Sequence, residues 1–295
     1  MEQKRVHLAN GMHLMCVDEG PVDAPVLIFL HGFPESHRTW RHQIEHFKDR
    51  YRCIAPDQRG YRQSSKPLEV DAYAPNHLIG DVFLLADALA IPNFTIVGHD
   101  WGGAIAWGVA LAGQHARVNR AIIANAPHPA IFQKLLYTSP TQREASQYIR
   151  AFRDTANDAL VKDEGLTGLL DKVVKWQNSG AMEPEERAQL MRDYQNRDAA
   201  FGMLNYYRAS QMVVPTMDAP FELPTDYAPP DLPDLTIPTL VIWAMDDLAL
   251  PSENLEGLDE VINPLTLVQV PDCGHFVPWE APEAVISAME AFLEG

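Results

Sequence analysis

The 295-residue sequence has few cysteines, no long apolar segment and no apolar signal core at its start. The three cysteines, Cys16, Cys53 and Cys273, have neither the spacing of a metal site nor that of a disulfide framework, which favours a reduced compartment. No segment approaches the roughly 20 apolar residues that a transmembrane helix requires. From these absences we expect a soluble cytoplasmic protein without a membrane span.

Basic residues are also scarce, with 23 Lys and Arg against 40 Asp and Glu, which gives a formal net charge of −17. Binding of nucleic acid needs clustered Lys and Arg to meet the phosphates, and no such run occurs, so nucleic acid is excluded as a partner. Hydrophobic residues make up 46% of the chain, enough to bury a large core. The length fits one α/β domain with an insertion. The oligomeric state stays open, with a homodimer as one option.

Residues 98–103 read GHDWGG and separate an apolar run at 94–97, typical of a buried strand, from an apolar stretch at 104–112, typical of a helix. A strand that turns into a helix within a few residues needs small flanking residues, and Gly98 and Gly102 meet this need. The pattern is the nucleophile elbow G-x-S-x-G, with an aspartate, Asp100, in place of the serine. The alternative is an aspartate that only caps a helix.

The aspartate changes the chemistry that the elbow predicts. Serine attacks acyl carbons and needs a base to remove its proton. An ionised aspartate can instead displace a leaving group at a saturated carbon, which leaves an ester of its own side chain. The free N–H groups of the first helical turn favour a carboxylate at this place.

The remaining periodicity predicts a mostly parallel sheet with helices on both faces, an α/β fold. The chain opens with a hairpin of residues 6–8 and 13–18 around Asn10-Gly11. Further apolar runs predict strands at 26–30, 52–55, 94–97, 121–124, 239–243 and 265–270, and apolar residues at helical spacing predict a helix over 76–90.

The alternation of strands and helices stops after residue 129. Residues 130–213 have helical propensity and no strand-like runs, with a helix start at Glu183-Pro184-Glu185-Glu186. Residues 215–238 contain seven prolines and predict an extended connector. We therefore expect an α/β core of residues 1–129 and 237–295, interrupted by an all-helical cap with a proline-rich return at 130–236.

Two loops follow early strands of this sheet. After residues 26–30, the loop at 31–36 can present the backbone N–H of Phe33, which with that of Trp101 would form an oxyanion hole; the alternative is an ordinary connection with Pro34 near a helix start. The loop after residues 52–55 contains Asp57 and Arg59, which could pair locally, and we interpret it as structural scaffolding.

Two late strands end in polar residues. Asp246 and Asp247 follow the strand at 239–243, and His275 follows Gly274 after the strand at 265–270. A nucleophile, then an acid, then a histidine is the chain order of the α/β-hydrolase triad.

From about residue 5 to its end, the chain resembles an epoxide hydrolase of the α/β-hydrolase fold. The matching segments are HGFPES at 31–36, DQRGYRQSSKP at 57–67, GHDWGG at 98–103, NAPHP at 125–129, LNYYR at 204–208 and DCGH at 272–275. The resemblance implies that Asp100 is the nucleophile, His275 the base and Asp247 the acid. Asp246 is the nearer rival for the acid. Some haloalkane dehalogenases place the acid after the strand at 121–124, but Asn125 stands there, and an amide cannot balance an imidazolium.

The family also requires two tyrosines from the cap, whose hydroxyls hold and protonate the epoxide oxygen. Tyr207 matches the second of these and Tyr148 matches the first, whereas core packing or a solvent-facing ring is the better interpretation of Tyr206. The resemblance implies a small apolar epoxide and water as substrates, a covalent ester on the nucleophile and a vicinal diol as product. It calls for no metal or organic cofactor.

The sequence departs from the family pattern at Arg62, where glycine is usual, and at Ala244-Met245, where Gly-Glu or a similar pair is commoner. The alternative function is that of a haloalkane or haloacid dehalogenase with the same three catalytic residues. Haloalkane dehalogenases often have a halide-binding asparagine where Phe33 stands, and fluoroacetate dehalogenases have arginine where Trp101 stands. Asp100 disfavours a serine esterase, and the complete set of three residues disfavours a non-catalytic receptor.

Overall fold

The computed structural model describes residues 1–173 and 182–295, and one eight-stranded sheet runs through it in the order β1-β2-β4-β3-β5-β6-β7-β8. β3 to β8 are parallel to one another, and β2 joins β4 in the antiparallel sense. The α/β hydrolase fold expected from the sequence is confirmed. The strands are β1 (Gln3–His7), β2 (His13–Glu19), β3 (Val26–Leu30), β4 (Arg52–Asp57), β5 (Phe94–His99), β6 (Val118–Ala124), β7 (Thr239–Ala244) and β8 (Leu265–Val270).

β1 and β2 form the hairpin that the sequence predicts, with Val6 opposite Leu14 and His7 opposite His13. Gly11 in the connecting turn has φ of +83°, a left-handed conformation that glycine adopts without steric cost. The other strands lie where the apolar runs predict them, although β4 and β5 each extend two residues further and β6 begins three residues earlier.

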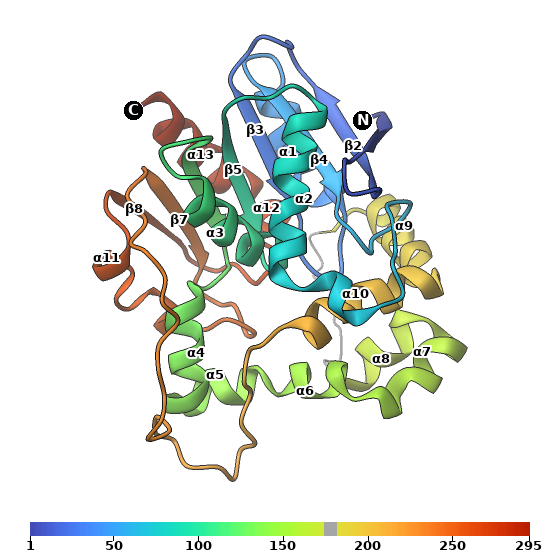
Figure 1. The fold of residues 1–295 in the computed structure, drawn as a ribbon, viewed down its shortest axis with the longest axis vertical. Helices are drawn as coiled ribbons and strands as arrows, with labels where there is room; N and C mark the ends of the chain where they lie inside the picture. The colour runs from blue at the N-terminus through green and yellow to red at the C-terminus, as the bar shows by residue number, and fades with distance from the viewer. Residues whose placement is uncertain (174–181) are drawn as a thin grey trace.

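Helices cover both faces of the sheet (Figure 1). α2 (Pro75–Ala88) and α3 (Trp101–Gly113) pack on one face, and α1 (Arg41–Phe47), α12 (Val277–Glu280) and α13 (Pro282–Glu294) pack on the other. The helices α1 and α13 were not predicted from the sequence, although Val285, Ile286 and Met289 have the spacing of a helical apolar face. Short helices complete this part: α11 (Leu258–Val261) and the 3₁₀ helices His37–Trp40, Val70–Tyr73 and Ser252–Leu255.

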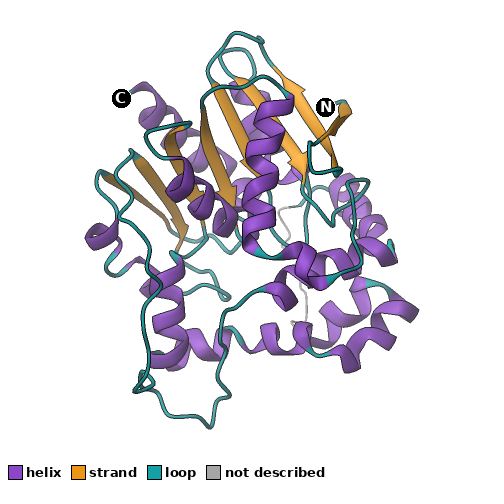
Figure 2. Ribbon diagram, in the orientation of Figure 1, coloured by secondary structure: helices purple, strands orange, loops and turns teal. Residues whose placement is uncertain are grey.

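A run of helices connects β6 to β7 and lies along one end of the sheet (Figure 2). We call residues 129–209 the helical insertion. The expected helix start at residue 184 is confirmed, and residues 210–238 form no helix or strand. The helices are α4 (Pro129–Thr138), α5 (Pro140–Ala145), α6 (Gln147–Arg153), α7 (Asp158–Glu164), α8 (Leu166–Val173), α9 (Pro184–Tyr194) and α10 (Arg197–Ala209), with a 3₁₀ turn at Thr155–Asn157. The expected cap also includes residues 174–181, which lie outside the described residues.

Ion pairs fasten α9 and the residue before it to the core. Three arginines from the loops and helices around β3 and β4 meet three carboxylates of this segment: Arg38 with Glu186, Arg41 with Glu183, and Arg62 with Asp193. No described helix combines the length and apolar character that crossing a membrane would require.

Candidate active site

Asp100 occupies the turn between β5 and α3 and has φ of +51°, which is sterically unfavourable for a residue with a side chain. The turn is tight on both sides, because a Cβ on Gly98 would overlap the carbonyl of Gly102, and one on Gly102 would overlap that of Leu30. The small flanks expected of a nucleophile elbow are therefore required by the backbone. The turn lifts the Asp100 side chain out at the end of the strand.

The two carboxylate oxygens of Asp100 have different neighbours. Oδ1 accepts a hydrogen bond of 2.6 Å from the backbone N–H of Phe33, and Oδ2 lies 3.5 Å from His275 Nε2. Burial would raise the pKa of Asp100, but the hydrogen bond and charge of His275, together with the Phe33 N–H, hold it below its usual value. Trp101 begins α3, where the first N–H groups of a helix have no intrahelical partner. The Phe33–Pro34 bond is cis.

His275 joins Asp100 to Asp247. Its Nδ1 lies 2.7 Å from Asp247 Oδ2, and Asp247 is buried whereas Asp246 is exposed. The other oxygen, Oδ1, accepts from the backbone N–H groups of Ala249 at 2.8 Å and Leu250 at 3.0 Å. Burial lowers the pKa of His275, but the charges and hydrogen bonds of the two aspartates outweigh it and raise this pKa well above its usual value.

Tyr148 on α6 and Tyr207 on α10 face the same region from the helical insertion. The Tyr207 ring meets the rings of Phe33 and Trp101 edge to face, each with 5.1 Å between ring centroids, and the Tyr148 ring lies 6.1 Å from that of Tyr207. Burial, and to a lesser extent nearby negative charge that includes Asp100, raise the pKa of both hydroxyls above the usual tyrosine value. Both tyrosines therefore remain protonated at neutral pH.

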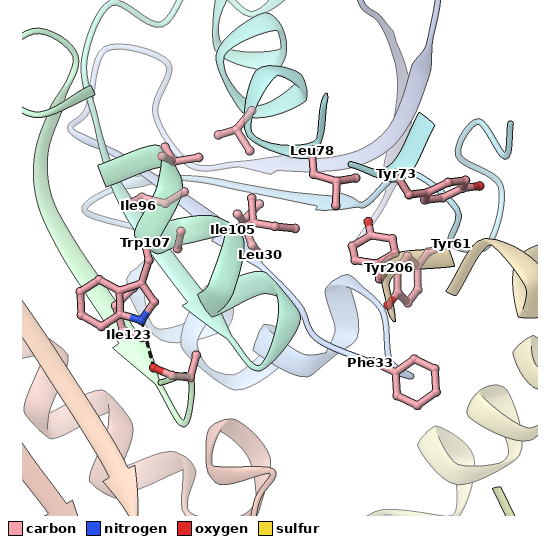
Figure 3. Close-up of a cluster of buried hydrophobic side chains, with 14 of the residues drawn as sticks. Leu30, Phe33, Tyr61, Tyr73, Leu78, Ile96, Ile105, Trp107, Ile123 and Tyr206 are labelled. Carbon is pink, nitrogen blue, oxygen red and sulfur yellow. Dashed lines mark hydrogen bonds between the residues drawn. The ribbon is translucent and has the colours of Figure 1, made fainter. Parts of the chain in front are cut away.

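The Tyr206 hydroxyl points into the core, although its ring also lies edge to face with that of Trp101, with 5.7 Å between ring centroids. Tyr206 is 1% exposed, its hydroxyl donates a hydrogen bond of 2.8 Å to the carbonyl of Arg59, and its ring packs against those of Tyr61 and Tyr73. Figure 3 shows these three rings together, separate from Phe33. Of the two interpretations of Tyr206, core packing is confirmed, and a solvent-facing ring is wrong.

Residues 25–282 match the α/β hydrolase fold family. A solved epoxide hydrolase from metagenomes of hot environments is 79% identical to this chain, with a TM-score of 0.98 over 100% of this chain and 99% of the other. The chain belongs to the epoxide hydrolases of the α/β-hydrolase family.

More distant members of the family show the same likeness. Epoxide hydrolase 1 of Caenorhabditis elegans is 32% identical over 292 residues, which cover 96% of this chain and 68% of the relative. An epoxide hydrolase from Bacillus megaterium, solved in complex with an inhibitor, is 28% identical. Its TM-score is 0.85 over 99% of this chain and 100% of that one.

Arg62 occupies the position where the resemblance leads us to expect glycine, and its backbone conformation is one that favours glycine. Arg62 has φ of +44°, the left-handed region. Its Nε lies 3.3 Å from Oδ2 of the buried Asp57, and its guanidinium also pairs with Asp193 of α9. The arginine thus adds to this α/β hydrolase a link between β4 and the helical insertion.

Asp57 and Arg59 do not pair with each other, so the expected local pair is wrong. Asp57 receives hydrogen bonds from the backbone N–H of His37 at 3.0 Å and from the Gln3 side chain at 2.8 Å. Arg59 instead forms a bidentate pair with Asp81 of α2. Each residue thus finds a partner that is distant in sequence.

Sequence reasoning missed Glu35 and His99. Glu35 is 6% exposed, and its carboxylate accepts from Thr39 Oγ1 at 2.8 Å and from Trp279 Nε1 at 2.7 Å. Burial raises its pKa to about 7, against the lowering effect of these bonds. His99 Nδ1 lies 4.0 Å from Glu35 Oε2, and its Nε2 is 2.8 Å from the carbonyl of His275. The sequence signal that could have identified Glu35 is its position as a charged residue within the HGFPES motif.

Among the described residues, no group of three or more His, Cys, Asp or Glu side chains has the arrangement needed to hold a metal ion. The ionisable groups of the site instead contact one another. This arrangement is suited to nucleophilic attack and proton transfer by the protein's own side chains.

Proposed function

We propose that this protein hydrolyses epoxides to vicinal diols through a covalent ester on Asp100. The observation that carries the proposal is that His275 lies between two aspartates, with Nε2 3.5 Å from Asp100 Oδ2 and Nδ1 2.7 Å from Asp247 Oδ2. Two tyrosines from the helical insertion face the same region. The epoxide hydrolases to which the chain is similar support the substrate class.

In the first step, Asp100 attacks a carbon of the oxirane. The Phe33 N–H occupies Oδ1, so Oδ2 is the oxygen that forms the bond to carbon. The C–O bond of the ring breaks, and its electron pair goes to the departing oxygen. Tyr148 and Tyr207 donate hydrogen bonds to this oxygen and supply its proton, because their hydroxyls are protonated at neutral pH.

In the second step, water hydrolyses the ester. Alkylation removes the negative charge of Asp100, and with it one of the causes that hold the pKa of His275 high. His275 can therefore release its proton after the first step, and this proton restores the tyrosine that protonated the leaving oxygen. The neutral imidazole that remains is available as the base. It takes a proton from water at Nε2 while Asp247 stabilises the imidazolium through Nδ1.

The hydroxide equivalent then adds to the carbonyl carbon of the ester. The N–H groups of Phe33 and Trp101 stabilise the charge that develops on Oδ1 in this step, and such a donor typically contributes about two to three powers of ten in rate. Collapse of this intermediate breaks the ester bond, restores the Asp100 carboxylate and releases the diol.

The helical insertion completes the site as a cap over the strand ends. In this proposal residues 1–129 and 237–295 form the hydrolase core, and residues 130–236 form the cap and its proline-rich return. The core supplies the groups for ester chemistry, and the cap supplies both hydroxyls for the leaving oxygen. The two tyrosines favour an epoxide over a haloalkane, since a halide leaves without a proton.

The experiment that tests the function is a parallel incubation with panels of epoxides and haloalkanes, in which diol and halide release are followed. We expect diol formation from at least one class of epoxide, styrene-like, alkyl or fatty, and slow or undetectable halide release. Halide release faster than hydration of every epoxide would assign a dehalogenase instead.

A further inference from the structure

A buried amide lies behind the acid. Asn125 directly follows β6, is 0% exposed, and donates through Nδ2 a hydrogen bond of 2.8 Å to Asp247 Oδ2. This is the same carboxylate oxygen that meets His275 Nδ1 at 2.7 Å. The amide and the imidazole therefore share one oxygen of Asp247.

The orientation of the Asn125 side chain is fixed by the neighbouring strand. Its Oδ1 accepts from the backbone N–H of Ala244 at 2.8 Å, and its own backbone N–H donates to the carbonyl of Ile242 at 3.0 Å. Because Oδ1 must face an N–H donor, Nδ2 must face Asp247. The backbone has φ of +37°, a region in which asparagine occurs more often than most residues. This position therefore suits a short side chain that both donates a hydrogen bond to Asp247 and accepts one from the Ala244 N–H.

The carboxylate of Asp247 is consequently held from both sides. Two backbone N–H groups of the following loop bind Oδ1, and Asn125 binds Oδ2, so the carboxylate plane has little freedom to rotate. With this plane fixed, the N–H of His275 Nδ1 has a defined acceptor. The opposite nitrogen, Nε2, then faces Asp100.

We propose that Asn125 is a positioning residue for ester hydrolysis, because it locks Asp247 Oδ2 in the orientation that aims His275 at the ester. The inference rests on the proposed function, and it goes further by separating the two half-reactions. Alkylation of Asp100 needs no base, so Asn125 matters little for it. Hydrolysis needs a correctly aimed base, so Asn125 matters there.

Two substitutions distinguish this role from simple packing. Asn125→Ala removes the donor. Asn125→Asp keeps the shape, but two carboxylates at the 2.8 Å separation of this pair cannot both be ionised, so the new side chain donates to Asp247 only while the pair holds a shared proton. The groups that already face His275 are Asp100, Asp247, Glu35 and His99, and both variants leave these unchanged.

The test is single-turnover mixing of an epoxide with the parent and both variants across pH, with alkyl-enzyme followed by intact mass and diol by product analysis. For Asn125→Ala we expect alkylation within about twofold of the parent and ester hydrolysis slower by about ten- to a hundredfold, so that the adduct accumulates. For Asn125→Asp we expect ester hydrolysis to fall relative to the parent as the pH rises and the shared proton is lost, because the donor to Asp247 Oδ2 is then gone. If Asn125→Ala does not fold, the nearly isosteric Asn125→Asp carries the test.

Asn254→Ala is a matched control, because Asn254 is another fully buried asparagine whose amide bonds to Gln142 and to the Pro251 carbonyl. It should lower stability without changing the ratio of the two half-reactions. Parallel slowing of both half-reactions in Asn125→Ala, or hydrolysis at the parent rate, would overturn the inference. So would an Asn125→Asp variant whose ester hydrolysis follows the parent at every pH. Failure of both the parent and His275→Gln to form any adduct would instead overturn the proposed function on which it rests.

Discussion

Asp100, Asp247 and His275 all follow strands of one sheet, whereas Tyr148 and Tyr207 come from separate helices of the insertion. The first group is connected by polar contacts between side chains and to backbone N–H groups. The second is surrounded by rings, with Phe152 5.3 Å from Tyr148 and 5.0 Å from Tyr207 between centroids. The side chains at the strand ends are therefore held by hydrogen bonds to particular atoms, whereas those of the insertion are held by packing between rings.

This difference follows from how each region is built. Strands in register place the residues that follow them within hydrogen-bonding distance, because each strand is tied to its neighbours along its length. Helices of the insertion pack through side chains, and aromatic contacts tolerate shifts that a hydrogen bond of 2.7 Å does not. We expect the groups on the sheet to form and hydrolyse the ester, and the groups on the insertion to hold and protonate the leaving oxygen.

The sharpest way to test the sheet group is Asp100→Ala. The variant should lose epoxide turnover by about four powers of ten or more, because no other group forms the ester. Its fold should stay intact, since the Asp100 side chain is partly exposed at the end of a strand. Activity assays with circular dichroism and a melting curve check both expectations, and diol formation by the purified variant near the parent rate would refute the assignment.

His275→Gln should separate the two chemical steps. Alkylation proceeds without a base, so intact-mass spectrometry after mixing with substrate should show an adduct equal in mass to the epoxide. Hydrolysis of that adduct should be too slow for steady turnover, because no base remains beside the ester. Ring opening without an adduct would point to direct attack by water.

The tyrosines test the contribution of the insertion. A hydrogen bond to a charged oxygen is worth roughly 1.5–3 kcal/mol, so Tyr207→Phe and Tyr148→Phe should each slow epoxide turnover by about one to two powers of ten. The double variant should be nearly inactive although Asp100 stays ionised. Single-turnover alkylation rates measure the effect directly.

Tyr206→Phe is the control, because its hydroxyl donates to the Arg59 carbonyl away from the site. It should lower the free energy of unfolding by about 0.5–1.5 kcal/mol and leave the alkylation rate almost unchanged. A double Phe variant at positions 148 and 207 that opens epoxides at the parent rate would remove the insertion from the chemistry.

Glu35 lies where the sheet and the helical insertion meet. Of the residues substituted here, we expect it to affect turnover least, and its substitution tests stability instead. Together with residues of α9 such as Leu190 and Asp193, it lines a cavity of about 20 Å³, room for one water molecule. Its folded pKa of about 7 exceeds the ordinary glutamate value of 4.5. Between these pH values the folded chain keeps a proton that the unfolded chain has lost, so this contribution to stability is full below pH 4.5 and is lost as the pH rises to 7.

We therefore expect Glu35→Gln to flatten the fall in unfolding free energy over this window, a difference on the order of 2 to 3 kcal/mol. Urea unfolding of parent and variant at both ends of the window measures it. An equal parent-to-variant difference at the two pH values would show that Glu35 does not titrate there.

The sequence by itself determined the elbow and the strand ends. A strand, a glycine-flanked Asp100 and an apolar helix can fold locally in few ways, since the small residues and the apolar runs are contiguous. The same local logic placed the hairpin at the start of the chain, the strands and the start of α9. The family resemblance, carried by short motifs, then pointed to residues that periodicity cannot select.

Only the tertiary structure decided which atoms each side chain contacts. Tyr206 and Tyr207 are adjacent on α10, where successive residues point about 100° apart. The Tyr206 hydroxyl therefore meets the Arg59 carbonyl in the core, whereas the Tyr207 ring meets that of Phe33. The partner of Arg59 is Asp81, and the donor behind Asp247 is Asn125, each joined across elements that are distant in sequence. Such contacts depend on how strands and helices are brought together, because a side chain's partner is set by distance in space and not by distance along the chain.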